Sequence, residues 1–116
     1  MENLYYKTKL YLEANSKTES EFDSNIVLQN DGAGDYIKTW NVSGLVKPND
    51  SQLNALSSTA TTKENNAKIF KTRITNYGNW QDQLDKLYHD IDDGKLDKNG
   101  SWYKHIKAVK DANAKE

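Results

Sequence analysis

The stretch NIVLQNDGAGDYIKTWNV, residues 25–42, has local chemistry that dictates one shape. It begins with an apolar, largely β-branched run, passes through turn-forming residues at 30–34, and returns to strand-forming types over 36–42. Gly32 and Gly34 supply the backbone freedom that a tight loop needs, and Asn and Asp side chains can hydrogen-bond to their own backbone. The pattern predicts an antiparallel β-hairpin. Because the remainder of the chain has mostly helical patterns, we expect this hairpin to be the platform on which the helices pack.

Side chains alternate between the two faces of a regular strand, and this constrains the second half of the hairpin. Ile37 and Trp40 are three positions apart, so a regular strand cannot direct both toward the core. We predict that Trp40 is buried and that Tyr36 and Lys38 share its face, the lysine by its aliphatic stem alone.

Composition limits the classes of protein to consider. The 116 residues are 35% hydrophobic, with 7 Tyr and 3 Trp, so we expect one domain over 1–116 with a thin, aromatic-rich core, a hairpin-centred N-terminal half and a helical C-terminal half. The 16 Lys and Arg against 17 Asp and Glu argue against nucleic-acid binding as a role. The lack of cysteine excludes disulfides and thiolate zinc sites. The opening MENLYYKTKL resembles neither a signal peptide nor a membrane span.

Two segments leave alternatives open. Residues 3–15 fit a helical face through Leu4, Thr8, Tyr11 and Leu12, but they also fit strand alternation; their length and the stop at Asn15 favour the helix. Residues 51–76 predict one long helix with a weak Ser/Thr-rich middle. Two shorter helices with a kink near Thr61 are the alternative.

The last two helices have clearer signals. Residues 79–92 follow a cap signal at Gly78 and carry apolar side chains at helical spacing, namely Trp80, Leu84, Leu87, Tyr88 and Ile91. Residues 101–112 predict a helix capped by Ser101. Its apolar side comprises Trp102, Ile106 and Val109, and its lysines 104, 107 and 110 face solvent. The fold class expected is therefore α+β, with a small hairpin at about 25–42 and three to four helices at about 3–15, 51–76, 79–92 and 101–112.

Motifs for catalysis or cofactor binding are missing or in the wrong register. The acidic run DIDDGKLDKNG, residues 90–100, does not place oxygen ligands as an EF-hand loop requires. His89 and Asp93 have one-face helical spacing but lack further ligands, and GAG in the hairpin is not a phosphate-binding glycine motif. The aromatics and lysines of 101–112 are better explained by an amphipathic helix than by RNA contact. We expect no catalytic, cofactor-binding or metal-binding residues and no cofactor.

The hairpin residues LQNDGAGDYIKTWN, followed by KPNDSQLNAL, resemble the XkdW family of small phage-encoded proteins. The likeness spans about a quarter of the chain. The segment from Trp80 to Asn113 is similar to the endings of short phage proteins encoded near tail-fibre genes. Family members are small α+β proteins without an established molecular role. The resemblance implies phage or prophage origin and a structural or assembly role around the tail. The longer N-terminal segment and the Ser/Thr-rich middle helix depart from the family pattern.

From this resemblance we expect a non-enzymatic minor tail component or an accessory factor for tail-fibre assembly, located in the virion or the host cytoplasm. A small binding protein acting on a host factor or RNA is the alternative. Other phage proteins are the expected partners, and a homo-oligomer is a further expectation, because the predicted apolar stripes exceed what one hairpin covers. The residues expected to make structural or partner contacts are Tyr36, Trp40, Phe70, Trp80, Leu84, Tyr88 and Trp102.

Overall fold

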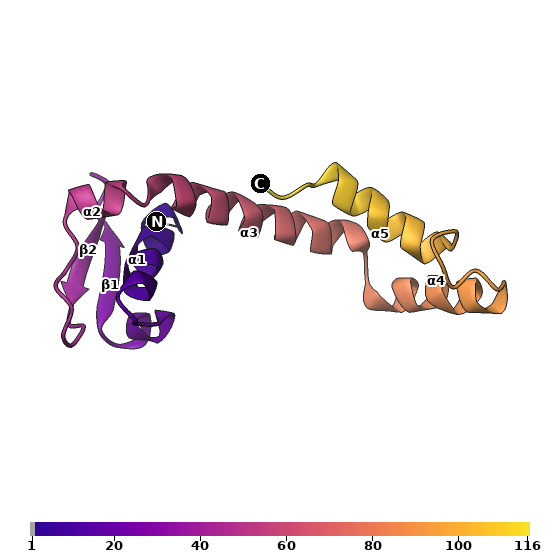
Figure 1. Cartoon of the computed structure of the whole chain (residues 1–116), viewed down its shortest axis with the longest axis horizontal. Helices are drawn as coiled ribbons and strands as arrows, with labels where there is room; N and C mark the ends of the chain where they lie inside the picture. The colour runs from indigo at the N-terminus through magenta and orange to yellow at the C-terminus, as the bar shows by residue number, and fades with distance from the viewer. Residues whose placement is uncertain (1) are drawn as a thin grey trace. The chain divides into compact units, whose positions relative to one another are not determined.

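The computed structural model describes residues 2–116 and confirms the α+β class, with one antiparallel hairpin and five α-helices in that range (Figure 1). The elements in chain order are α1 Glu2–Ala14, the short 3₁₀ helix η1 Glu19–Asp23, β1 Ile26–Asn30, β2 Asp35–Trp40, α2 Asp50–Asn54, α3 Ser57–Tyr77, α4 Trp80–Asp92 and α5 Ser101–Ala112. The chain divides into two units, one ending at Glu64 and one running from Asn65 to Glu116. The boundary between the units falls within α3.

The hairpin is present as predicted, but β2 is not a regular strand. Leu28 pairs with Ile37 and Val27 pairs with Thr39, so Lys38 is an extra residue that forms a β-bulge. The bulge shifts the alternation by one, and Ile37 is buried while Trp40 is half-buried against the same core. The prediction that Tyr36 and Lys38 share the buried face of Trp40 is therefore wrong, because both are exposed. The Lys47 ammonium donates to the Ile37 carbonyl oxygen beside the bulge, at 3.0 Å.

The core of the first unit lies between α1, the hairpin and α2. The helical interpretation of residues 3–15 is confirmed, and the inward side of α1 carries Leu4, Thr8 and Leu12. Thr8 is fully buried, and its hydroxyl donates to the Leu4 carbonyl oxygen at 2.7 Å, so burial leaves this group hydrogen-bonded. The buried apolar residues of this core are Leu4, Leu12, Ile26, Ile37, Val42 and Leu53.

The segment predicted as one long helix is two helices. Asn49 caps α2 in a reciprocal capping box with Gln52. The break falls at Ala55 and Leu56 rather than at Thr61, so the alternative had the right number of helices but the wrong position. The Leu56 amide bonds to the carbonyl three residues back instead of four, which tightens the chain into a turn.

The second unit comprises the C-terminal part of α3 together with α4 and α5. Arg73 on α3 donates from Nε to the Asn113 carbonyl oxygen at 2.8 Å, just beyond the end of α5. Asn65 and Asn66 contact Glu116 in the same polar seam. The single buried apolar side chain among the described residues of this unit is Val109. The second unit is therefore held together by polar contacts and half-buried groups more than by a closed apolar core.

Candidate protein-contact surface

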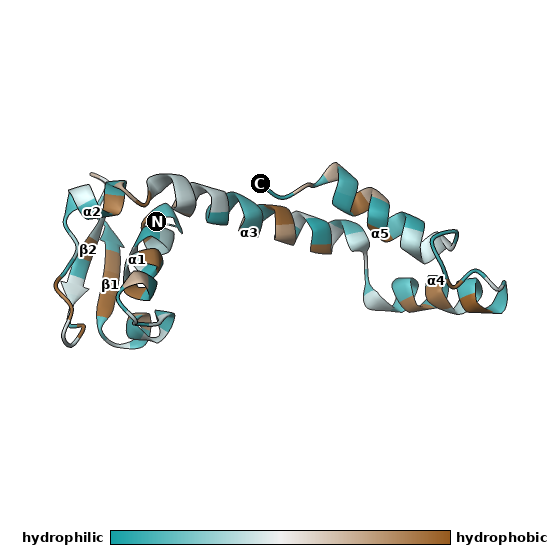
Figure 2. Ribbon diagram, in the orientation of Figure 1, coloured by the Kyte–Doolittle hydropathy of each residue, from teal (hydrophilic) through white to brown (hydrophobic). Residues whose placement is uncertain are grey.

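The candidate contact surface is the apolar side of α4, a helix that begins where the sequence predicts. Gly78 adopts a φ of 82°, and the Asn79 side chain accepts a hydrogen bond from the Asp82 amide at 2.8 Å. At 100° per residue, the five apolar side chains of α4 fall within an arc of about 100°. Four of them are between 54% and 65% exposed, namely Trp80, Leu84, Tyr88 and Ile91. The stripe that would normally pack inward therefore faces solvent. Figure 2 marks the apolar segments that recur along the α4 ribbon.

The side of α4 that does pack is mostly polar. Gln83, Lys86, Leu87 and Asp90 are the half-buried or buried residues of this helix. On a helical projection Gln83 and Asp90 lie roughly 90–110° to one side of the centre of the apolar stripe. α5 thus contacts α4 on the shoulder of the stripe, through Leu87 and Asp90, and leaves the stripe itself uncovered.

Asp90 fixes this arrangement because its carboxylate caps the next helix. Oδ1 accepts from the amide and the hydroxyl of Ser101, both at 2.8 Å, and Oδ2 accepts from the Trp102 amide at 2.8 Å. The hydrogen bond from the Trp102 amide, followed by those from Ser101, holds the pKa of Asp90 below its usual range. The expectation that Ser101 caps α5 is wrong: Gly100 occupies the cap position and has no side chain, and Asp90 supplies the missing acceptor.

Gly100 completes this cap because no larger residue fits. A Cβ atom there would lie 2.5 Å from the Lys95 carbonyl oxygen and 2.7 Å from Asp90 Oδ2. The Lys95 amide in turn donates to the Asp90 carbonyl oxygen at 2.7 Å. The acidic run that invited a calcium interpretation therefore contains a tight helix connection in which Asp90 binds backbone amides.

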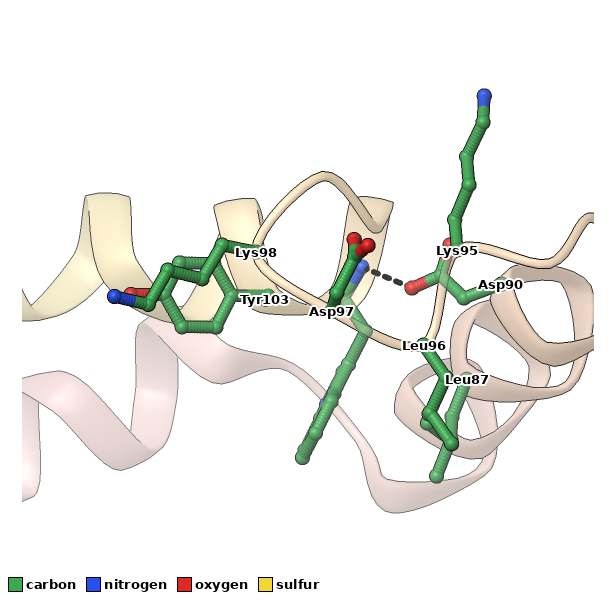
Figure 3. A pocket seen from close by; sticks show the side chains of 8 residues that line it. Leu87, Asp90, Lys95, Leu96, Asp97, Lys98 and Tyr103 are labelled. Atoms are coloured by element: carbon green, nitrogen blue, oxygen red, sulfur yellow. Dashed lines mark hydrogen bonds between the residues drawn. The ribbon is translucent and has the colours of Figure 1, made fainter.

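Two hollows lie along the junction of α4 and α5 and share Leu87 and Trp102. One, of about 240 Å³, is bordered by the connecting loop, including Leu96 and Lys98 (Figure 3). The other, of about 220 Å³, is lined by Trp80, Gln83, Leu84, Leu87 and Trp102. Both are smaller than the roughly 300–1,000 Å³ of typical small-molecule sites, so their shape suits side chains of a protein partner better.

The structure brings three of the seven predicted contact residues together, because Trp80, Leu84 and Trp102 line one hollow. Tyr88 extends the same stripe of α4, and its ring contacts His89 edge-on. Phe70 is 54% exposed on α3, with the Lys115 ammonium 5.8 Å from its ring centre.

The other two predicted residues belong to the hairpin unit. Trp40 packs beside Tyr11 and donates from its indole nitrogen to the Leu45 carbonyl oxygen at 2.8 Å. Tyr36 is exposed, and its hydroxyl donates to Asp31, which lowers the pKa of that carboxyl and raises the pKa of the phenol. Both residues thus have structural partners within the hairpin unit.

Sequence reasoning did not single out the remaining lining residues. Leu96 is 66% exposed in the connecting loop, and Tyr103 on α5 borders the first hollow. A signal for the Asp90 cap was present in the sequence, since an aspartate near a helix end is followed ten residues later by Gly100 and then by Ser101. Amide donors at a helix start attract such a carboxylate. The excess of apolar stripes predicted that some would stay uncovered, but the spacing did not say that the stripe of α4 would be the exposed one.

Residues 2–116 contain no group of three or more His, Asp or Glu side chains placed to hold a metal ion. His89 lies 3.5 Å from Asp85 and does not pair with Asp93 through its side chain. Over the same described range, none of the helices has the length and apolar character needed to cross a membrane.

Comparison of the chain with protein-family models, with curated proteins and with solved structures found no match in any of the three.

Proposed function

We propose that this chain is a non-enzymatic phage structural or assembly protein, either a minor tail component or an accessory factor for tail-fibre assembly. Its phage origin is supported by the resemblance of the hairpin and of the C-terminal segment to small phage proteins. Its mode of action is binding to protein through the apolar side of α4 and the adjoining side chains of α5.

The observation that carries the binding role is the orientation of α4. Its polar side packs within the chain while Trp80, Leu84, Tyr88 and Ile91 face outward. Exposed apolar patches of this extent mark interaction sites in soluble proteins. Aromatic residues are also the side chains most enriched at the centres of protein interfaces.

A crosslinking experiment tests this role. A photoreactive phenylalanine analogue replaces Tyr88 in the protein produced during phage growth, and the matched control carries the analogue at Val46, which is 81% exposed in the first unit. We expect ultraviolet light to join position 88, but not position 46, to an identifiable phage-encoded protein or to a second copy of the chain. Equal, diffuse labelling at both positions would contradict a binding surface on α4.

Mass spectrometry of purified particles separates the two proposed roles. A tail component is present in fixed stoichiometry, whereas an assembly factor is absent from the finished particle. Crosslinks to a host protein or to RNA instead of phage proteins would favour the alternative, a small binding protein directed at the host. The Lys107 ammonium is already paired with Asp111 at 2.6 Å, which leaves α5 with less free positive charge for RNA.

A further inference from the structure

We propose that the occupant of the α4 surface is a second copy of this chain, in a two-fold pair in which α4 of each copy lies against α5 of the other. This inference rests on the proposed function, because it names the partner of the same surface. Three observations carry it: the area left exposed, the opposite charges of the two helices, and the hollow on the outer side of α5.

The exposed apolar area matches what a stable pair requires. Seven large side chains on α4, α5 and their connection are exposed, namely Trp80, Leu84, Tyr88, Ile91, Leu96, Trp102 and Tyr103. With about 200 Å² for each side chain, their exposed fractions amount to roughly 750 Å². A typical specific interface buries about 800 Å² on each partner.

The two helices carry opposite charge. α4 contains Asp82, Asp85, Asp90 and Asp92 against Lys86 alone, whereas α5 contains Lys104, Lys107 and Lys110 against Asp111 alone. On the helical projection Asp85 and Asp92 border the apolar stripe on the edge away from the chain's own α5. A partner helix laid on the stripe therefore meets an acidic border, which the lysines of α5 from another copy can match.

The outer side of α5 has a place for the stripe of the other copy. Tyr103, Ile106, Lys107, Lys110 and Asp111 line a shallow hollow of about 200 Å³. Its floor is apolar, and at its border Lys110 and the Lys107–Asp111 pair leave a net positive charge, which complements the aspartate border of the α4 stripe. Two-fold symmetry is also satisfied, because α4 of the first copy then meets α5 of the second while α5 of the first meets α4 of the second. Contact of α4 with α4 would instead oppose two rows of aspartates.

Sedimentation of the purified full-length chain tests the pairing, from about 1 to about 100 μM, the range in which a micromolar dimer assembles. We expect the mass to rise from 13.3 kDa toward twice that value. Leu84→Glu should weaken association at least tenfold, because it puts a charge in the centre of the stripe. Val46→Glu, which places the same charge on an exposed apolar residue of the first unit, is the matched control and should leave association unchanged.

A charge exchange tests the arrangement. One variant carries Asp85→Lys and Asp92→Lys, and a second carries Lys107→Glu and Lys110→Glu. Each alone should be monomeric at concentrations where the wild type pairs, and an equimolar mixture should form the mixed dimer, since opposite charges then meet at both contacts. Unimpaired pairing of the second variant alone would overturn the contact of α4 with α5. Circular dichroism of each variant shows that the helices are retained.

Two results would overturn the second copy as occupant. If the chain stays monomeric at 100 μM and its tryptophans are accessible to quencher, the α4 surface is not covered by a second copy. If position 88 then crosslinks to a different phage protein, the proposed function stands and only this inference fails. A monomer whose tryptophans are all shielded covers its own surface, and both proposals fail together.

Discussion

Trp40 joins the hairpin to the first helix and to the segment that follows β2, by two contacts of different kinds. Its ring packs beside Tyr11 and its indole nitrogen donates to the Leu45 carbonyl oxygen at 2.8 Å. Because the ring is half-buried, we expect Trp40→Ala to lower the free energy of unfolding by about 2–3 kcal/mol, below the 3–5 kcal/mol of a fully buried ring. Trp40→Phe keeps most of the packing and should lose about 1 kcal/mol with the hydrogen bond. Urea titration followed by circular dichroism measures both changes. Equal losses for the two variants would show that the hydrogen bond, not the packing, dominates.

The ionised carboxylate of Asp90 makes the stability of the second unit depend on pH. Its pKa is lower in the folded chain than in the unfolded chain, so the unfolded chain binds more protons as the pH falls. The contribution of the carboxylate is fully present above the ordinary aspartate pKa of about 3.9 and is lost as the pH falls through the lower folded-state pKa.

We therefore expect Asp90→Asn to melt at a lower temperature than the wild type at pH 7, and the difference to shrink below about pH 4. The difference between the two proteins is the informative quantity, because Glu19 and Asp31 also have lowered pKa values. Thermal melts between pH 7 and pH 2 measure it. Asp93→Asn, at an exposed neighbour, is the control and should change the midpoint little at pH 7. A constant difference at every pH would assign the effect to shape and not to charge.

At the scale of elements, hydrophobic spacing predicted the positions of the helices well. It predicted less well which side of each helix packs against the rest of the chain. α4 begins and ends within a residue of its predicted limits, because Asn79 and Gly78 are local signals. Whether its stripe packs inward depends on where α5 is held, and that is decided by the Asp90 carboxylate, eleven residues before Ser101. Spacing within one helix contains no information on such a contact.

The bulge and the helix break were missed for a related reason. Lys38 gives no local sign that it is an extra residue, and only pairing with Val27 and Leu28 across the hairpin defines it. The break falls at Ala55 and Leu56, which are themselves good helix formers, and the Ser/Thr-rich stretch that was expected to be weaker remains helical in α3.

The contrast between α1 and α4 predicts their rates of amide hydrogen exchange. α1 has Thr8 and Leu12 fully buried, whereas the buried residue of α4 is the capping carboxylate of Asp90. In dilute solution we expect the slowest amides of α4 to exchange at least about tenfold faster than those of α1. Mass spectrometry after exchange measures this. At higher protein concentration, protection from exchange should rise in α4 and not in α1. Equal protection of both helices in dilute solution would contradict the conclusion that α4 is poorly covered by the rest of the chain.

At the scale of the whole molecule, association and stability are linked if the second copy is the occupant. A hundredfold increase in protein concentration should raise the thermal midpoint by roughly 5 °C, since the folded pair is favoured by mass action. Leu84→Glu should remove this dependence, while Val46→Glu should retain it. A midpoint independent of concentration in a reversible melt would show that folding does not require the pair.

The prediction of one domain over 1–116 has a related test, which is whether fluorescence from Trp40 and from Trp80 changes at the same temperature.

The extra residue in β2 also determines which edits the hairpin tolerates. Removal of Lys38 would leave Ile37 and Trp40 two positions apart, so a regular strand would direct both toward the core and the strand pairs on either side of the bulge would be kept. The loop Asp31–Gly34 lies beyond the last strand pair, between Asn30 and Asp35, so a peptide inserted there leaves the phase of both strands intact. An epitope tag or a reporter peptide therefore belongs at the tip of the hairpin, while deletion of Val27 from β1, a strand with no extra residue to lose, would turn either Ile26 or Leu28 outward.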